Sequence, residues 1–180
     1  GATIKAICTN TTGCPLTDGV GGTYTLNPQG ATKPTYDGTV KSLTDCVTKS
    51  VSTLPDATIL CQQNGEDVDF KDAGDYDISL KLGDVVSEPQ TYTIEQADLT
   101  ANDFTFNAPN DLEYNEQAKE AVVAFNNGAD GTITVHYYDA SGNPKPPIDA
   151  GTYTVRIDVS GCTNFYDVQN LTADGWKFTI

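Results

Sequence analysis

Apolar and polar side chains alternate in two long stretches, "DYDISLKL" from Asp75 to Leu82 and "TYTVRIDV" from Thr152 to Val159. Every second residue in both is Tyr, Val, Ile or Leu, and the residues between them are mostly polar. Strict alternation predicts a β-strand with one buried and one solvated face, because successive side chains of a strand point to opposite sides. The same tripeptide, Asp-Ala-Gly, stands in front of both strands, and this indicates an internal repeat.

The repetition extends beyond these two strands. The further pairs of matching stretches are "PTYDG" and "LEYNE" (34–38 and 112–116), "DATILC" and "DGTITV" (56–61 and 130–135), and "TYTI" and "KFTI" (91–94 and 177–180). The order of the elements is the same twice. The sequence therefore predicts two tandem domains, residues 1–94 and 95–180, joined as a semi-stiff, elongated chain. Residues 1–21 precede the first copy, and "ATIKAIC" within them alternates like an added strand.

The predicted strands are short, rich in β-branched and aromatic residues, and separated by Gly, Pro, Asn and Asp. This pattern is typical of an all-β fold, and we expect two Ig-like β-sandwich domains. The stretch "EQAKEAVVAF" (116–125) has local helical propensity. Because it aligns with the Thr- and Val-rich "GTVKSLTDCV" (38–47), we interpret it as a strand.

The Asp-Ala-Gly tripeptide suggests a turn that starts a core strand. Asp72 and Asp149 are suited to an Asx-turn, and Gly74 and Gly151 adopt positive φ without a Cβ penalty. The Tyr two residues after each Gly (at 76 and 153) then enters the core, and we expect it to act like the tyrosine corner of sandwich domains.

Charge and composition exclude several function classes. The chain carries 25 acidic and 10 basic residues, a formal net charge of −15. Such a surface repels nucleic acid and anionic lipid, so we expect neither nucleic-acid binding nor direct membrane contact. The sequence has neither an apolar run long enough to span a bilayer nor a signal peptide, and we expect a piece of a longer protein.

The stretch from "YTIEQADLT" through "LEYNEQAKEAVV" to "KFTI" resembles the bacterial Ig-like repeats of MBG type, and the related YDG-type repeats share the pattern. The first copy contains "TYDG" at 35–38, whereas the second has Tyr114, Asn115 and Glu116. The resemblance implies a non-catalytic structural or adhesion module of a larger secreted or surface-anchored bacterial protein. Its partners would be neighbouring repeats of the same chain and a host protein or glycan. The alternative is a carbohydrate-binding accessory module of a secreted glycoside-degrading enzyme.

The five cysteines allow at most two internal disulfides. Cys8 and Cys14 flank a short polar turn, and Cys46 and Cys61 are expected on two facing core strands. The candidates are therefore a Cys8–Cys14 and a Cys46–Cys61 bond, with both members of the second pair as buried free thiols as the alternative. Cys162 has no evident partner.

Candidate catalytic and metal-binding residues are few. His136 is the single histidine and is expected on a polar strand face, so we predict no enzyme and no catalytic residue. The acidic loops suit solvated charge better than structural Ca²⁺, and we expect no cofactor and no metal. An intramolecular Lys–Asn or Lys–Asp isopeptide bond would involve Lys41 or Lys119, but nothing in the pattern marks either as buried.

Aromatic residues gather in the second copy at Tyr138, Phe165, Tyr166 and Trp176. Trp176 alternates with Phe178 and Ile180, so we expect it in the core. Tyr138, Phe165 and Tyr166 are the candidates for an exposed patch that binds a glycan or a protein.

Overall fold

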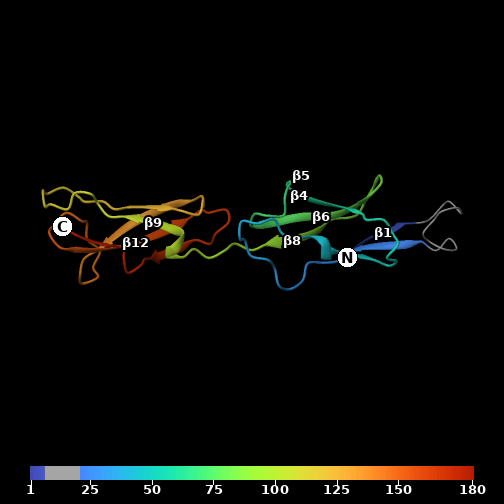
Figure 1. The fold of residues 1–180 in the computed structure, drawn as a ribbon, viewed down its shortest axis with the longest axis horizontal. Coiled ribbons are helices and arrows are strands. Elements are labelled where there is room, and N and C mark those ends of the chain that lie inside the picture. Colours follow the sequence, from blue (N-terminus) through green and yellow to red (C-terminus); the bar gives the residue numbers. More distant parts are fainter. Residues whose placement is uncertain (7–20) are drawn as a thin grey trace. The chain divides into compact units, whose positions relative to one another are not determined.

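Strands supply the regular structure of the residues that the computed structural model describes, 1–6 and 21–180, apart from two 3-10 helices of one turn each. Within every sheet, neighbouring strands are antiparallel. The all-β prediction is therefore confirmed. The chain divides into two units, Gly1–Glu95 and Gln96–Ile180, which are described separately below (Figure 1).

The first unit contains a three-stranded sheet in the order β1-β2-β3 and a five-stranded sheet in the order β5-β4-β6-β7, in which β8 also pairs with β6. β1 is the added N-terminal strand that the sequence predicts. The elements are β1 (Ala2–Ala6), β2 (Gly22–Leu26), η2 (Thr44–Cys46), β3 (Val47–Lys49), β4 (Thr58–Gln63), β5 (Glu66–Asp67), β6 (Gly74–Leu82), β7 (Val85–Val86) and β8 (Gln90–Ile94).

The second unit contains a two-stranded sheet of β9 and β10 and a four-stranded sheet in the order β11-β12-β13, in which β14 also pairs with β12. The elements are η3 (Ala101–Asp103), β9 (Phe104–Asn107), β10 (Val122–Phe125), β11 (Thr132–Tyr138), β12 (Thr152–Ser160), β13 (Val168–Leu171) and β14 (Lys177–Thr179). This is the arrangement of the first unit without strands that correspond to β1 and β5, because β13 pairs with the end of β12 as β7 pairs with the end of β6.

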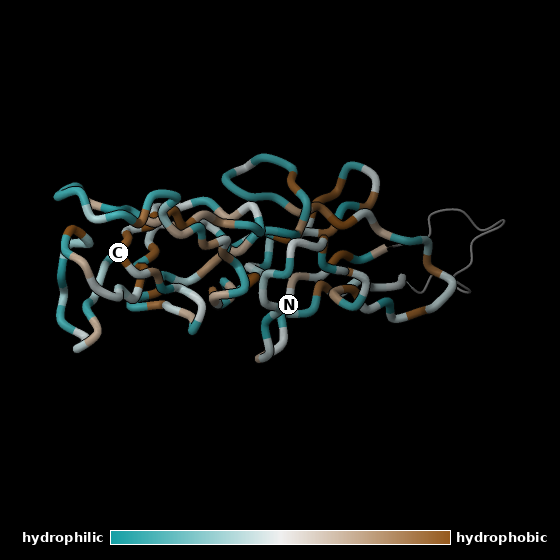
Figure 2. Tube along the Cα trace, turned by 60° about the vertical axis from the view of Figure 1, so that its left-hand side comes forward, coloured by the Kyte–Doolittle hydropathy of each residue, from teal (hydrophilic) through white to brown (hydrophobic). Residues whose placement is uncertain are grey.

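The central strands β6 and β12 are the two alternating stretches of the sequence, and they contribute most of the fully buried side chains. In β12, burial alternates strictly, with Tyr153, Val155, Ile157 and Val159 all at most 2% exposed. Figure 2 shows the interleaving of hydrophobic and hydrophilic positions along the trace. In each unit the buried residues of both sheets form one hydrophobic cluster, as in a β-sandwich.

The expected tyrosine corner is present in both units. The Tyr76 hydroxyl donates to the main-chain carbonyl of Asp72 at 2.7 Å, and the Tyr153 hydroxyl donates to that of Asp149 at 3.0 Å. The glycine between them has a positive φ in both turns, 141° at 74 and 156° at 151. A buried hydroxyl needs a partner, and the carbonyl four residues earlier supplies it.

The strands that carry these tyrosines pair in the same way in both units. Tyr76 of β6 lies opposite Tyr92 of β8, and Tyr153 of β12 lies opposite Phe178 of β14. Tyr92 and Phe178 occupy matching places in "TYTI" and "KFTI". The two stretches that the sequence aligns are therefore also equivalent in their pairing.

The second unit confirms one local prediction and corrects another. Trp176 is 6% exposed and packs edge-on against Phe104 at 6.1 Å between ring centroids, so it is a core residue. The strand predicted for 116–125 exists only as β10, from Val122 to Phe125. The prediction failed for the residues before it because Glu116, with φ of 60°, belongs to a turn.

Removing either tyrosine hydroxyl should destabilise the unit that contains it. The substitution Tyr76→Phe or Tyr153→Phe leaves a part-buried carbonyl without its donor. We expect each to lower the free energy of unfolding of its own unit by about 1–2 kcal/mol. Hydrogen exchange in urea, followed by mass spectrometry, reports on each unit through its own peptides. Tyr166→Phe, at an exposed ring, is the control and should change neither unit. Equal effects of all three substitutions would contradict the assignment.

Candidate functional site

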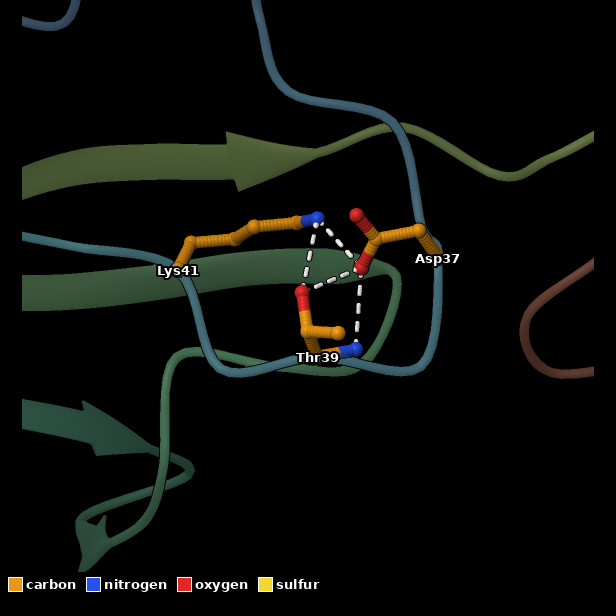
Figure 3. Close-up of polar contacts among 3 residues, drawn as sticks. All are labelled: Asp37, Thr39 and Lys41. Carbon is orange, nitrogen blue, oxygen red and sulfur yellow. Dashed lines mark hydrogen bonds and ion pairs between the residues drawn. The ribbon is translucent and has the colours of Figure 1, made fainter.

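The "YDG" motif of the first unit forms a closed turn (Figure 3). Asp37 Oδ1 accepts hydrogen bonds from the Thr39 amide at 2.9 Å and from the Thr39 hydroxyl at 2.6 Å, and it pairs with Lys41 Nζ at 2.5 Å. The Lys41 hydrogen bond, followed by those of Thr39, holds the pKa of the Asp37 carboxyl far below its usual range. Gly38, between them, has φ of 78°, a conformation that favours glycine. Asp37 and Gly38 of the motif therefore both serve the turn.

The second unit builds the same turn from different side chains. Asn115 Oδ1 accepts the Gln117 amide at 3.1 Å, as Asp37 accepts that of Thr39. Glu116 takes the left-handed conformation, with φ of 60°, at the place of the glycine. The turn survives because an amide oxygen accepts a hydrogen bond as a carboxylate does.

The lysine after each turn has a matching main-chain contact but a different ionic partner. The amide of Lys41 donates to the Phe70 carbonyl at 2.7 Å, and that of Lys119 donates to the Pro147 carbonyl at 2.9 Å. Because Asn115 is neutral, Lys119 pairs instead with Asp111, at 2.5 Å between Nζ and Oδ2. The Lys119 side chain is only 6% exposed, a burial that the sequence pattern does not indicate.

The Lys119–Asp111 contact is an ion pair whose geometry does not favour an isopeptide bond. Amide formation joins the lysine nitrogen to the carboxyl carbon with loss of water, and it needs a neutral amine and a neutral carboxyl. The Asp111 side chain is 61% exposed, and the Lys119 hydrogen bond lowers its carboxyl pKa. Asp111 therefore stays a carboxylate near neutral pH.

The predicted Cys46–Cys61 disulfide is not present, because the structure has both residues as free cysteines. Cys46 ends the one-turn helix η2 before β3, in the three-stranded sheet, whereas Cys61 lies in β4 of the other sheet, opposite Ile78. The prediction placed both on facing core strands, whereas Cys46 ends a helical turn, and the free thiols agree with the alternative. Burial raises the pKa of both thiols, that of Cys61 to about 11. Cys8 and Cys14 lie outside the described residues.

Cys162 has a structural contact in the second unit. Its buried thiol donates to the Asp130 carbonyl at 2.6 Å, and the Asp130 carboxylate accepts the Thr163 amide at 2.9 Å. Gly131 passes so close that an added Cβ would lie 2.6 Å from the Cys162 sulfur. The thiol therefore packs in a site with room only for glycine beside it.

His136 lies on β11 in a cross-strand polar cluster. Its Nε2 is 3.0 Å from Asp158 Oδ2, and the other oxygen of Asp158 accepts the Asn170 amide at 2.8 Å. Arg156, opposite His136 in the register, stacks its guanidinium 4.5 Å from the centroid of the Tyr138 ring. These contacts join β11, β12 and β13 on one side of the sheet.

The three aromatic candidates do not form one patch. Tyr138 pairs with Thr154 near the start of β12, and Arg156 covers its ring. Phe165 packs against the core cluster and bridges to Ala97, in the segment that follows the end of β12. The ends of β12 lie about 26 Å apart at the usual rise per residue. Tyr166, at 46% exposed, is the one candidate with a widely exposed ring.

Metal-binding clusters are absent from the described residues, in which no group of three or more His, Cys, Asp or Glu side chains converges. The acidic side chains that have partners mostly cap turns, as Asp139 does when it accepts the Ser141 and Asn143 amides at 2.9 Å each. None of the described helices is long and apolar enough to cross a membrane.

The first unit contains a cavity of about 440 Å³ that the sequence does not signal. Phe70, Tyr92 and Cys46 form part of its wall, and all three are buried. Two of its polar wall groups are already engaged: the Gln29 amide exchanges two hydrogen bonds of 2.7 Å with the Thr93 main chain, and Tyr92 donates to the Asn27 carbonyl. A second hollow, of about 380 Å³, lies beside Tyr138 and the segment 144–147 in the other unit.

Comparison of the chain with models of known families, with curated proteins and with solved structures finds no match. The resemblance to MBG- and YDG-type repeats therefore stays a prediction.

Introducing glycine into the turn of the second unit and removing it from the turn of the first should have opposite effects on stability. Glu116→Gly removes the strain of a left-handed non-glycine residue, and the greater conformational entropy of glycine in the unfolded chain offsets part of this gain. We expect the free energy of unfolding of the second unit to rise by up to about 1 kcal/mol. Gly38→Ala should destabilise the first unit. Chemical denaturation with unit-specific hydrogen exchange measures both. A destabilising Glu116→Gly substitution would show that the Glu116 side chain has a role that the turn does not explain.

The Lys119–Asp111 ion pair should make the second unit sensitive to acid. The pKa of Asp111 is lower in the folded state than in the unfolded chain. The pair's contribution is therefore present above the ordinary carboxyl pKa near 4 and is lost as pH falls through the folded value. Lys119→Met should raise the Asp111 titration midpoint, as followed by carboxyl-carbon NMR. The Asp139 carboxyl, whose pKa is lowered mainly by the Asn143 amide, is the internal control and should not move. An unchanged Asp111 midpoint would refute the pairing.

Proposed function

We propose that this chain is a non-catalytic structural or adhesion module of a larger secreted or surface-anchored bacterial protein. The observation that carries the proposal is that the residues shared by the two units make the same folding contacts. Tyr76 and Tyr153 bond to equivalent carbonyls, Asp37 and Asn115 cap equivalent turns, and the following lysines bond to equivalent main-chain sites. A repeated sequence whose common residues all serve folding is typical of modular repeat proteins.

The polar clusters support a non-catalytic role. Asp158 is engaged by both His136 and the Asn170 amide, and Arg156 lies over Tyr138, so these side chains tie strands together. The net charge of −15 keeps such a module soluble and unassociated with other acidic surfaces.

The carbohydrate-binding alternative receives less support. Sugar recognition of this kind uses exposed aromatic ring faces, and Phe70 and Tyr92 beside the cavity of the first unit are 4% and 6% exposed. The three aromatic candidates of the second unit are separated as described above. We therefore place the structural role first.

If the two units are independent structural modules, each should unfold in its own step when the chain is stretched. Held between two handles in a force spectrometer, the chain should give two unfolding events. The 95 and 85 residues of the two units should each release roughly 300 Å of contour length, less the folded length. A single event that releases the whole chain would contradict two independent modules.

Localisation and ligand class have their own test. Antibodies raised against the chain should label intact cells or the culture fluid of the organism that makes it, without permeabilisation. A glycan array probed with the same chain tests the alternative. Binding of one glycan class that is lost in Tyr166→Ala, at the exposed ring, but kept in Tyr138→Ala would favour the carbohydrate-binding module. Labelling only after lysis would overturn the surface role.

A further inference from the structure

In the first unit, Glu95 follows β8 directly and pairs with the segment before the "YDG" turn. The Tyr36 amide donates to the Glu95 carbonyl at 2.9 Å, and the Glu95 amide donates to the Pro34 carbonyl at 2.8 Å. Thr35 and Glu95 thus form a parallel bridge. Tyr36 is half-buried and packs against the hydrophobic cluster of the unit.

The corresponding segment of the second unit is Leu112–Tyr114. The correspondence rests on the equivalent turns that follow it, in which Asn115 stands for Asp37 and Lys119 for Lys41. The end of β14 corresponds in the same way to the end of β8, because Phe178 lies opposite Tyr153 as Tyr92 lies opposite Tyr76. The position that matches Glu95 is therefore the one directly after Ile180.

Leu112–Tyr114 is open where its counterpart is covered. Leu112 is 38% exposed and Tyr114 is 55% exposed, and the residues from 111 to 118 are all in the exposed class. Within the described part of the chain, neither the Tyr114 amide nor the Leu112 carbonyl has a hydrogen-bond partner. A main-chain donor, a main-chain acceptor and an apolar ring are thus presented together, without the strand that occupies the same place in the first unit.

We propose that Leu112–Tyr114 is a strand-addition site, and that its occupant is the main chain of a peptide that continues β14 past Ile180 as Glu95 continues β8. The inference rests on the proposed function, since it takes the two units as copies of one module. The added residue accepts from the Tyr114 amide and donates to the Leu112 carbonyl, and the Tyr114 ring folds down against the core. Because main-chain atoms make the contact, the site accepts many sequences but rejects a residue without an N–H.

The test extends the full chain after Ile180 by Glu-Gln-Ala-Asp-Leu, the residues that follow Ile94 in the first unit. Hydrogen exchange should slow at least tenfold at the Tyr114 amide in the extended chain. A matched extension, Pro-Gln-Ala-Asp-Leu, lacks the N–H that bonds to the Leu112 carbonyl and should give clearly less protection. Unchanged exchange at Tyr114 in the first extension, or equal protection by both, overturns the proposal.

The Tyr36 amide of the same sample separates the proposal from the function beneath it. Protection at Tyr36 without protection at Tyr114 rejects the strand-addition site and leaves the repeat module intact. Rapid exchange at the Tyr36 amide would mean that the Glu95 pairing, on which the proposed site is patterned, does not form. It would count against both the strand-addition site and the repeat module. If the unextended chain already protects Tyr114 in proportion to its concentration, and sedimentation shows a dimer, the occupant is a second copy and the proposed continuation of β14 is wrong.

Discussion

The hydrogen bond from a core tyrosine to the carbonyl four residues earlier is the constraint on which each unit depends. The Tyr76 and Tyr153 rings are among the most buried in the chain, so their hydroxyls cannot rely on water. Bonding back to Asp72 and Asp149 fixes the turn against the strand that follows it. Because the same tyrosines face the last strand of each unit, the turn also sets the place at which that strand adds.

The sequence predicts the parts of the fold that local pattern determines. Alternation locates β6 and β12, the glycines of the Asp-Ala-Gly turn have the predicted positive φ, and Trp176 is in the core. Each of these features depends on residues only a few positions apart. Strand geometry and the conformational freedom of glycine are therefore enough to predict it. The Asx-turn predicted at Asp149 is not formed, because the Gly151 amide donates to the Ile180 carbonyl and the Asp149 carboxylate pairs with Lys145. The domain prediction assigned residues 1–94 and 95–180, and the observed division falls after Glu95.

Contacts that join distant segments are less predictable. The sequence left open whether Cys46 and Cys61 form a disulfide or stay free thiols, because it does not fix the distance between side chains of two sheets. The three aromatic candidates do not form one patch, because Tyr138 lies near the start of β12 whereas Phe165 and Tyr166 follow its end. The burial of Lys119 and its ion pair with Asp111 were not predicted, because no local pattern marks either. The one available signal was the change from Asp to Asn between the two copies, which leaves the second lysine in need of another anion.

The two units keep the same turn but differ in the ion pair of the lysine that follows it. The turn is retained when Asp becomes Asn because both side chains offer an oxygen to the same amide, but the ion pair is not, because it requires charge. Glu116 tolerates the left-handed conformation because the acceptor at Asn115 and the main-chain bond of Lys119 hold both sides of it. Fixed main-chain contacts thus allow the side chains around the turn to vary. The same reasoning applies to the open segment before it: a site that recognises only amides and carbonyls keeps its specificity for an extended strand whatever the neighbouring side chains become.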